Sequence, residues 1–196
     1  MVWILKEFLK GFIPSKLAII IALISIVIGI IVGVVAYFTN YLSFGNELSP
    51  LLTSSIEMKL IFFKNIIFNN VTVSFIAIIT GELIIVPYIM LVWNFINIGI
   101  FNTFLFLNYG LKSLLVLHSY FEIWAFILTL DSAMKISNIS LKYYRENLNN
   151  SDVNLKKIII SELISMFPRI LLLLIIASLL ETFWSPIVLN ELFMGV

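Results

Sequence analysis

The stretch Leu114–Asp131, LLVLHSYFEIWAFILTLD, is apolar enough to lie in lipid and yet carries His118, Glu122 and Asp131. A charged side chain at the centre of a bilayer costs roughly 2.5–3.5 kcal/mol on insertion scales, so such residues usually face a bundle interior, a cavity or a partner. His118, the single histidine of the chain, lies four residues before Glu122, which puts both on one helix face. We therefore expect any role beyond spanning a membrane to involve this segment.

The composition of the whole chain indicates an integral membrane protein. Of its 196 residues, 61% are hydrophobic and 12% are charged, and the mean hydropathy is +1.11. Soluble domains have about 45–50% apolar and about 25% charged residues. The net charge of +1 argues against nucleic acid as a partner, and the lack of cysteine excludes disulfides and thiolate metal sites. Since the sequence also has no glycine-rich phosphate loop, we predict no cofactor.

The apolar runs predict five membrane spans. Leu17–Phe38 has the length needed to cross about 30 Å of hydrocarbon at 1.5 Å per residue. Val71–Leu107 would form a single helix of about 55 Å, so it must hold two spans. We place their turn near Gly81 and Pro87 in preference to Asn94–Asn97. The predicted spans are approximately 17–38, 70–84, 87–107, 113–134 and 168–184.

Two further segments suit helices that lie on the membrane surface. Met1–Phe12 alternates apolar side chains with lysines, and the second half of Thr39–Asn70 has apolar residues at helical spacing. We expect the pair Asn69–Asn70 to turn the chain into the bilayer, and Pro168 to kink or restart a helix. The predicted fold class is therefore an all-α, polytopic membrane helix bundle, a single domain over residues 1–196.

The distribution of positive charge predicts the orientation of the bundle. The N-terminal segment has three lysines and the loop 135–157 has five basic residues, whereas the opposite side has Lys59, Lys64 and Lys112. The positive-inside rule then places the N-terminus and this loop in the cytoplasm, with the C-terminus outside the cell membrane. Five spans satisfy this arrangement, whereas four would put the basic loop outside.

Depth sorts the ionisable residues of the spans into two sets. The outer set is His118, Glu122 and Glu181, and the inner set is Glu82, Asp131 and Arg169. His118 and Glu122 suit interhelical hydrogen bonds that fix packing, and a proton or cation site is the alternative. A metal site is not predicted, because two ligands are too few. We interpret Asp131 and Arg169 as a charge-neutralising pair, because burying either alone is costly.

Four short motifs resemble the stage II sporulation protein M family of membrane proteins. LHSYFEIWAF (117–126) resembles its Pro-His-Gly-x-x-Glu-x-x-Ala signature, and IIFNNVTV (66–73) its Asn-Asn entry to the second span. WNFINIG (93–99) and IIASLLETFWSP (175–186) resemble its motifs in the third and last spans. Leu117, Ser119 and Phe95 depart from the family pattern. The resemblance implies a five-span bundle with buried His and Glu residues, and a named member that recruits wall-remodelling enzymes.

Three classes of function are considered. Against an enzyme, the sequence has no nucleophile–base–orienter set and no complete metal shell. Against a small proton- or cation-linked transporter or channel, it has no evident internal repeat. We predict a non-enzymatic scaffold that recruits or organises envelope proteins. Its expected partners are the lipid bilayer and another membrane protein or a second copy of the chain, and the transporter is the alternative.

Overall fold

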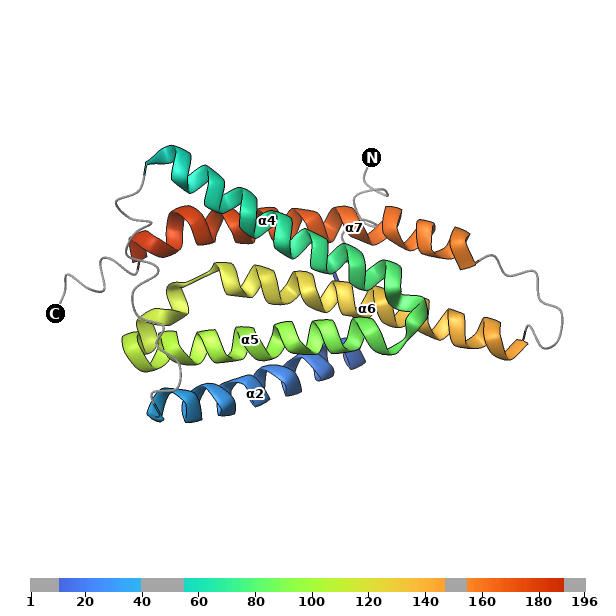
Figure 1. The fold of residues 1–196 in the computed structure, drawn as a ribbon, viewed down its shortest axis with the longest axis horizontal. Coiled ribbons are helices and arrows are strands. Elements are labelled where there is room, and N and C mark those ends of the chain that lie inside the picture. The colour runs from blue at the N-terminus through green and yellow to red at the C-terminus, as the bar shows by residue number, and fades with distance from the viewer. Residues whose placement is uncertain (1–10, 40–54, 147–154, 189–196) are drawn as a thin grey trace.

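The structure, a computed structural model, describes residues 11–39, 55–146 and 155–188. These residues form one bundle of five long helices, and successive helices run in opposite directions along its long axis (Figure 1). The predicted all-α fold class is confirmed. The predicted surface helix Met1–Phe12 lies almost wholly outside the described residues. The helices are α2 (Lys16–Phe38), α4 (Ile56–Ile79), α5 (Ile85–Tyr109), α6 (His118–Glu146) and α7 (Leu155–Leu179).

Four of the described helical segments are long and apolar enough to cross a membrane: Lys16–Phe38, Ile56–Leu83, Ile85–Tyr109 and Lys156–Val188. The fifth long helix, α6, is more polar because it lies at the centre of the bundle. It contacts α2, α4, α5 and α7, and every residue from 125 to 134 is buried. A helix surrounded by protein does not need an apolar surface towards lipid, so it can carry Thr129, Asp131 and Ser132.

Small residues bring α2 and α5 into close contact. Gly29 and Gly33 are spaced as Gly-x-x-x-Gly on α2, and Gly99 lies opposite on α5. A Cβ atom on Gly29 would lie 2.2 Å from the carbonyl oxygen of Ile96 and 3.0 Å from the Cα of Gly99. Glycines at such spacing let helix backbones approach closely in membranes, where dispersion contacts drive association. The Gly-x-x-x-Gly motif is visible in the sequence, but its partner on α5 is not.

The turn between the second and third long helices lies where the sequence analysis placed it. The short helix η1 (Thr80–Leu83) ends α4, and Ile84 adopts a positive φ of 55° before α5 begins. Gly81 allows this turn to lie against α6, because a Cβ there would be 3.0 Å from Ile136. The Ser137 hydroxyl donates a hydrogen bond of 2.6 Å to the Gly81 carbonyl and fixes the contact.

The prediction of a surface helix followed by a turn at Asn69–Asn70 is wrong. α4 is continuous from Ile56 to Ile79, and its first turn is capped by the Ser55 hydroxyl, which accepts from the Met58 amide. Asn70 is buried within this helix, and its side chain bonds to another helix. An asparagine whose amide has such a partner does not need to form a turn.

The last two long helices have other limits than the predicted spans. A short helix, η2 (Gly110–Leu115), precedes α6, which begins at His118 and not at residue 113. α6 then runs on to Glu146 and α7 begins at Leu155, so residues 135–146 and 155–157 of the predicted loop are helical. α7 passes through Pro168 without a break. A proline removes one backbone hydrogen bond, but residues on both sides of it, Met166, Ile170 and Leu174, are buried against α6 and hold the helix together.

Candidate functional site

We call the two ends of the bundle the Lys156 end, where α7 begins, and the Trp184 end, where its last turn lies. The Trp184 half contains the predicted outer set. The Nδ2 atom of Asn70 on α4 donates a 2.5 Å hydrogen bond to Oε1 of Glu122 on α6. His118 Nδ1 lies 2.8 Å from the Ser185 hydroxyl, and both residues are buried. The predicted interhelical hydrogen bonds of His118 and Glu122 are therefore present, each to a different element.

Glu181 completes this group, which we call the Glu122 cluster (Asn70, His118, Glu122, Glu181 and Ser185). It lies in η4 (Leu180–Trp184), a π-helical turn that continues α7. Such turns are rare and occur often at functional sites. The carboxyl groups of Glu181 and Glu122 are close enough to interact electrostatically, and both side chains are partly buried. The cluster thus joins α4, α6 and the end of α7 through polar side chains.

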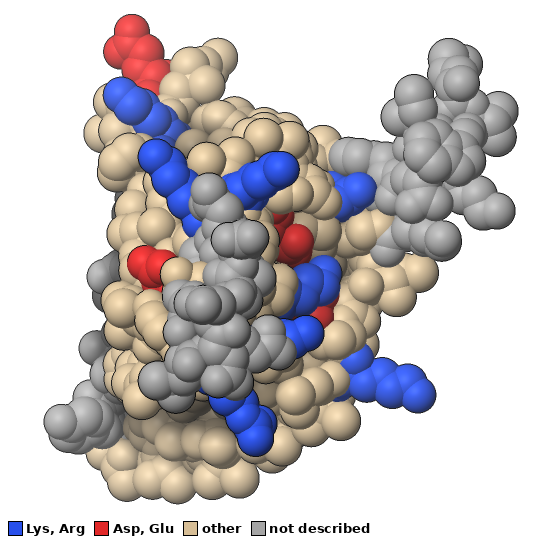
Figure 2. All heavy atoms as spheres, turned by 90° about the vertical axis from the view of Figure 1, so that its right-hand side faces the viewer, with Lys and Arg blue, Asp and Glu red and all other residues tan. Residues whose placement is uncertain are grey.

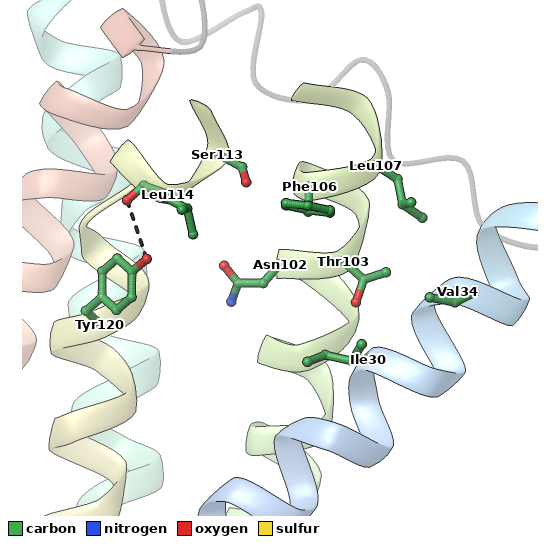
Figure 3. Close-up of a pocket in the computed structure, with 9 residues that line it drawn as sticks. All are labelled: Ile30, Val34, Asn102, Thr103, Phe106, Leu107, Ser113, Leu114 and Tyr120. Atoms are coloured by element: carbon green, nitrogen blue, oxygen red, sulfur yellow. Dashed lines mark hydrogen bonds between the residues drawn. The ribbon is translucent and has the colours of Figure 1, made fainter. Parts of the chain in front are cut away.

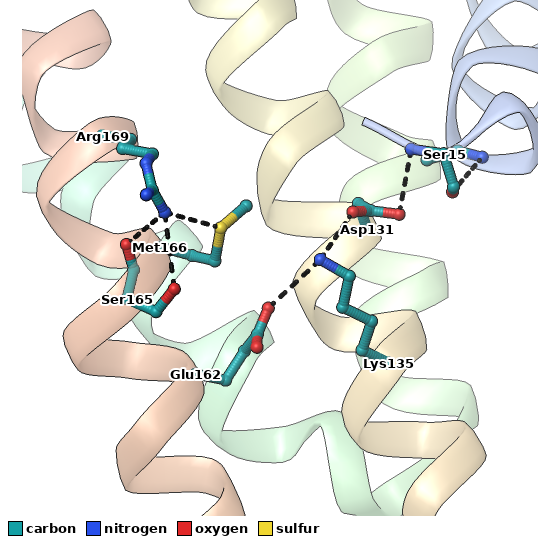
Figure 4. Close-up of polar contacts among 8 residues, drawn as sticks. Ser15, Asp131, Lys135, Glu162, Ser165, Met166 and Arg169 are labelled. Atoms are coloured by element: carbon teal, nitrogen blue, oxygen red, sulfur yellow. Dashed lines mark hydrogen bonds and ion pairs between the residues drawn. The ribbon is translucent and has the colours of Figure 1, made fainter. Parts of the chain in front are cut away.

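The Lys156 half holds a second group, the Asp131 cluster (Ser15, Asp131, Lys135 and Glu162). Asp131 Oδ2 lies 3.0 Å from Lys135 Nζ, and its Oδ1 accepts a 3.2 Å hydrogen bond from the Ser15 amide (Figure 4). Lys135 Nζ also lies 3.5 Å from Glu162 Oε1 on α7. Partial burial disfavours the charge of Lys135, but its bonds to Asp131 and the charge of Glu162 outweigh this and raise its pKa. The lysine therefore links α6 to α7.

The structure corrects the predicted pairing of Asp131 with Arg169. The ion pair of Asp131 is with Lys135, one helical turn along α6, a spacing that the sequence already offered. Arg169 donates instead to the Ser165 carbonyl at 2.5 Å and contacts the Met166 sulfur at 3.2 Å (Figure 4). Glu82 lies in η1, and within the described part of the chain no ion pair joins it to the other two.

Asp131 and Arg169 both contact the segment that precedes α2. Asp131 accepts from the Ser15 amide, and the Arg169 guanidinium packs on Gly11 so closely that a Cβ there would lie 2.2 Å from its Cζ. Between them, the Trp124 indole donates a 3.0 Å hydrogen bond to the Phe12 carbonyl. The start of the described chain is therefore anchored across α6 and α7, a contact that sequence patterns did not reveal.

A double-mutant cycle tests the new pairing. We expect Asp131→Ala and Lys135→Ala to show a coupling of about 0.5–3 kcal/mol in stability, as side chains in one ion-pair network do. Asp131→Ala with Arg169→Ala should show a smaller coupling, because their contacts are separate. Thermal unfolding in detergent gives the four values of each cycle. A larger coupling energy between Asp131 and Arg169 than between Asp131 and Lys135 would support the pairing that the sequence predicted.

The chemistry available to these clusters is limited. Among the described residues, no group of three or more His, Asp or Glu side chains is placed to hold a metal ion. In the Glu122 cluster, one carboxylate oxygen of Glu122 already accepts a hydrogen bond from Asn70, and Nδ1 of His118 is hydrogen-bonded to Ser185. Bonds of this kind suit interhelical attachment, which contributes about 0.6–2 kcal/mol each in membranes.

Five antiparallel helices, a polar central helix and apolar outer helices define a multi-span helical membrane protein. The chain belongs to the stage II sporulation protein M family, whose sequence profile matches residues 16–186. The match begins at the first residue of α2 and ends two residues after η4, so it includes both polar clusters except Ser15. No curated protein and no solved structure is significantly similar to the chain.

Proposed function

We propose that this chain is a non-enzymatic membrane scaffold that recruits or organises other envelope proteins. The observation that carries the proposal is the hairpin of α6 and α7 at the Lys156 end, which extends beyond the other helices (Figure 1). An extension of this kind is not needed to cross a bilayer. α6 has 29 residues, or about 43 Å at 1.5 Å per residue, against about 30 Å of hydrocarbon.

The surface of this hairpin suits a protein partner. Arg145 at the end of α6 and Lys156 at the start of α7 are exposed, and basic side chains surround this end of the molecule (Figure 2). Leu141 and Tyr144 are 49% and 57% exposed on the same extension. Apolar side chains bordered by charge are typical of interaction surfaces. We infer a partner with an acidic border around an apolar patch.

The proposal places the Lys156 end and the N-terminus in the cytoplasm, and the C-terminus outside the cell membrane. It rests on the excess of basic residues at that end. The chain has no cysteine, so single cysteines at the exposed residues Glu57 and Lys156, at opposite ends of the bundle, can be labelled from either side. We expect impermeant reagents to reach Lys156→Cys from the cytoplasm and Glu57→Cys from outside. Labelling of both from one side would refute this topology.

Copurification from native membranes tests the scaffold itself. We expect the wild-type chain to retain a specific protein partner and Arg145→Glu with Lys156→Glu to lose it by about tenfold, because like charges then face each other. Lys59→Glu, a charge reversal at the Trp184 end, serves as the control and should keep the partner. If all three chains recover the same amount of partner, the hairpin is not part of the interface. A wild-type chain that recovers no partner would contradict the scaffold function.

A second candidate function is proton- or cation-linked transport through the Glu122 cluster. The observation that favours it is that two partly buried carboxyl groups, those of Glu122 and Glu181, lie in the same half of the bundle and interact electrostatically. Paired acidic groups at membrane depth often mark ion pathways. The two functions differ in the expected effect of Glu122→Gln: a transporter would lose its ion-dependent flux, whereas a structural cluster would keep its fold and its partners.

A further inference from the structure

A cavity of about 430 Å³ lies near the Trp184 end between α2, α5, η2 and the start of α6 (Figure 3). Ile30 on α2, Phe106 on α5, Leu114 in η2 and Tyr120 on α6 are between 42% and 54% exposed, so the cavity is open to the surroundings of the bundle. Its volume is within the range of about 300–1,000 Å³ that is usual for small-molecule sites. The complete lining is Ile30, Val34, Asn102, Thr103, Phe106, Leu107, Ser113, Leu114 and Tyr120.

The four polar side chains of the lining already donate their hydrogen bonds to backbone carbonyls. Asn102 Nδ2 donates to Ile98, Thr103 to Gly99, Ser113 to Gly110 and Tyr120 to Leu114, at 2.9, 2.9, 2.8 and 3.4 Å. The other five lining residues are hydrocarbon. The cavity therefore offers a ligand mainly apolar contact, and an apolar cavity is a poor site for water. What fits such a lining is a hydrocarbon chain.

The position of the cavity identifies the source of that chain. α2 and α5 are both long and apolar enough to cross a membrane, and the side chains of α2 beside the cavity, such as Val27 and Ile31, are exposed. In a spanning helix, side chains of this kind are in contact with lipid. The cavity is continuous with this lipid-facing surface. A helix of a partner does not fit, because a helix about 10–12 Å across fills such a volume in one turn of about 5.4 Å.

We propose that this cavity binds one acyl chain of a membrane phospholipid. Figure 3 shows Asn102 projecting from α5 towards Leu114 and Tyr120, with Ser113 above them in η2, whereas Thr103 lies on the side of α5 that faces Ile30 and Val34. The acyl chain lies between the pair α2 and α5 on one side and η2 with the start of α6 on the other, and passes Ile30 and Val34. The lipid then fills the groove beside the contact between α2 and α5, where Gly33 meets Thr103. This inference does not depend on the scaffold function.

Photolabelling tests the proposal. The full chain is reconstituted in vesicles that contain phosphatidylglycerol with a diazirine in one acyl chain, and the labelled peptides are identified after irradiation. We expect label to concentrate on the peptides with Phe106, Leu107 and Leu114, and unlabelled phosphatidylglycerol in excess to compete for it. Label spread evenly over the exposed residues of α2 and α5, without saturation, would mean that only bulk lipid touches the protein.

Matched variants locate the labelled site. Ile30→Trp should fill the cavity and reduce labelling of those peptides by about tenfold, or about 1.4 kcal/mol in binding free energy. Ile31→Trp adds the same side chain at the next residue of α2, which is 59% exposed and not part of the lining, and should not change it. If Ile30→Trp impairs folding, Leu114→Trp replaces it as the test, because it fills the cavity from the opposite wall. Unchanged labelling in folded protein with either substitution in the lining would overturn the proposal, and so would an equal loss with Ile31→Trp.

Discussion

Gly29→Val should strongly destabilise the bundle. The first new atom would lie 2.2 Å from the carbonyl oxygen of Ile96, which belongs to the backbone of α5 and cannot rotate away. The two helices must separate, and the contact at Gly99 is then lost as well. Extra atoms in a well-packed interior cost about 1–3 kcal/mol, and a backbone clash belongs at the upper end of that range. We expect the midpoint of thermal unfolding in detergent to fall by about 2–4 °C per kcal/mol.

Val32→Leu is the matched control for this substitution. It adds one methylene to the same helix at a residue that is 43% exposed, where a larger side chain extends into lipid or detergent. Its unfolding midpoint should stay close to that of the wild type. If Gly29→Val unfolds at the same temperature as Val32→Leu, then α2 and α5 do not pack through these glycines.

Glu122→Leu is expected to be the most damaging change in the Glu122 cluster. It removes the acceptor of the 2.5 Å hydrogen bond from Asn70 and leaves a buried amide without its partner. An unsatisfied buried donor costs about 1–3 kcal/mol. Glu122→Gln retains an oxygen that can accept from Asn70, so this variant should remain folded. Thermal unfolding and recovery of monodisperse protein in detergent measure the difference.

Two comparisons make this result specific to the hydrogen bond. Asn70→Leu combined with Glu122→Leu should recover part of the stability, because both polar partners are then replaced by apolar groups. Proteoliposomes of wild type and Glu122→Gln test the transport alternative. An ion-dependent flux in the wild type that disappears in well-folded Glu122→Gln would show that the cluster binds an ion, and the structural interpretation would then be wrong.

The predicted positions of the polar sets were more reliable than the predicted partners within them. Counting residues from the ends of each span puts His118, Glu122 and Glu181 in one half of the bundle and Glu82, Asp131 and Arg169 in the other. Partners depend on the rotation of each helix about its axis, which a sequence does not specify. The bond of Glu122 to Asn70 and that of Asp131 to Ser15 are therefore visible only in the structure.

The errors in helix limits have a related cause. Asn69–Asn70 and Pro168 are local signals that favour a turn or a kink, and residues 135–146 are polar enough to suggest a loop. In the structure, long-range contacts outweigh these preferences. α4 continues because Asn70 bonds to α6, and α7 continues because its residues on both sides of Pro168 are buried. α6 continues because Ile136, Ser137 and Ser140 are buried, and because Lys135 pairs with Glu162 on α7.

The sequence by itself determined that this chain is a helical membrane protein, because the length and polarity of its segments decide which of them can remain in lipid. The turn near Gly81 and the family motifs were visible there too. Only the tertiary structure decided that α6 is the central helix, that glycines join α2 to α5, and that a cavity lies beside them. These features depend on which helix faces meet, and the free energy that selects those faces comes from contacts between residues far apart in the chain.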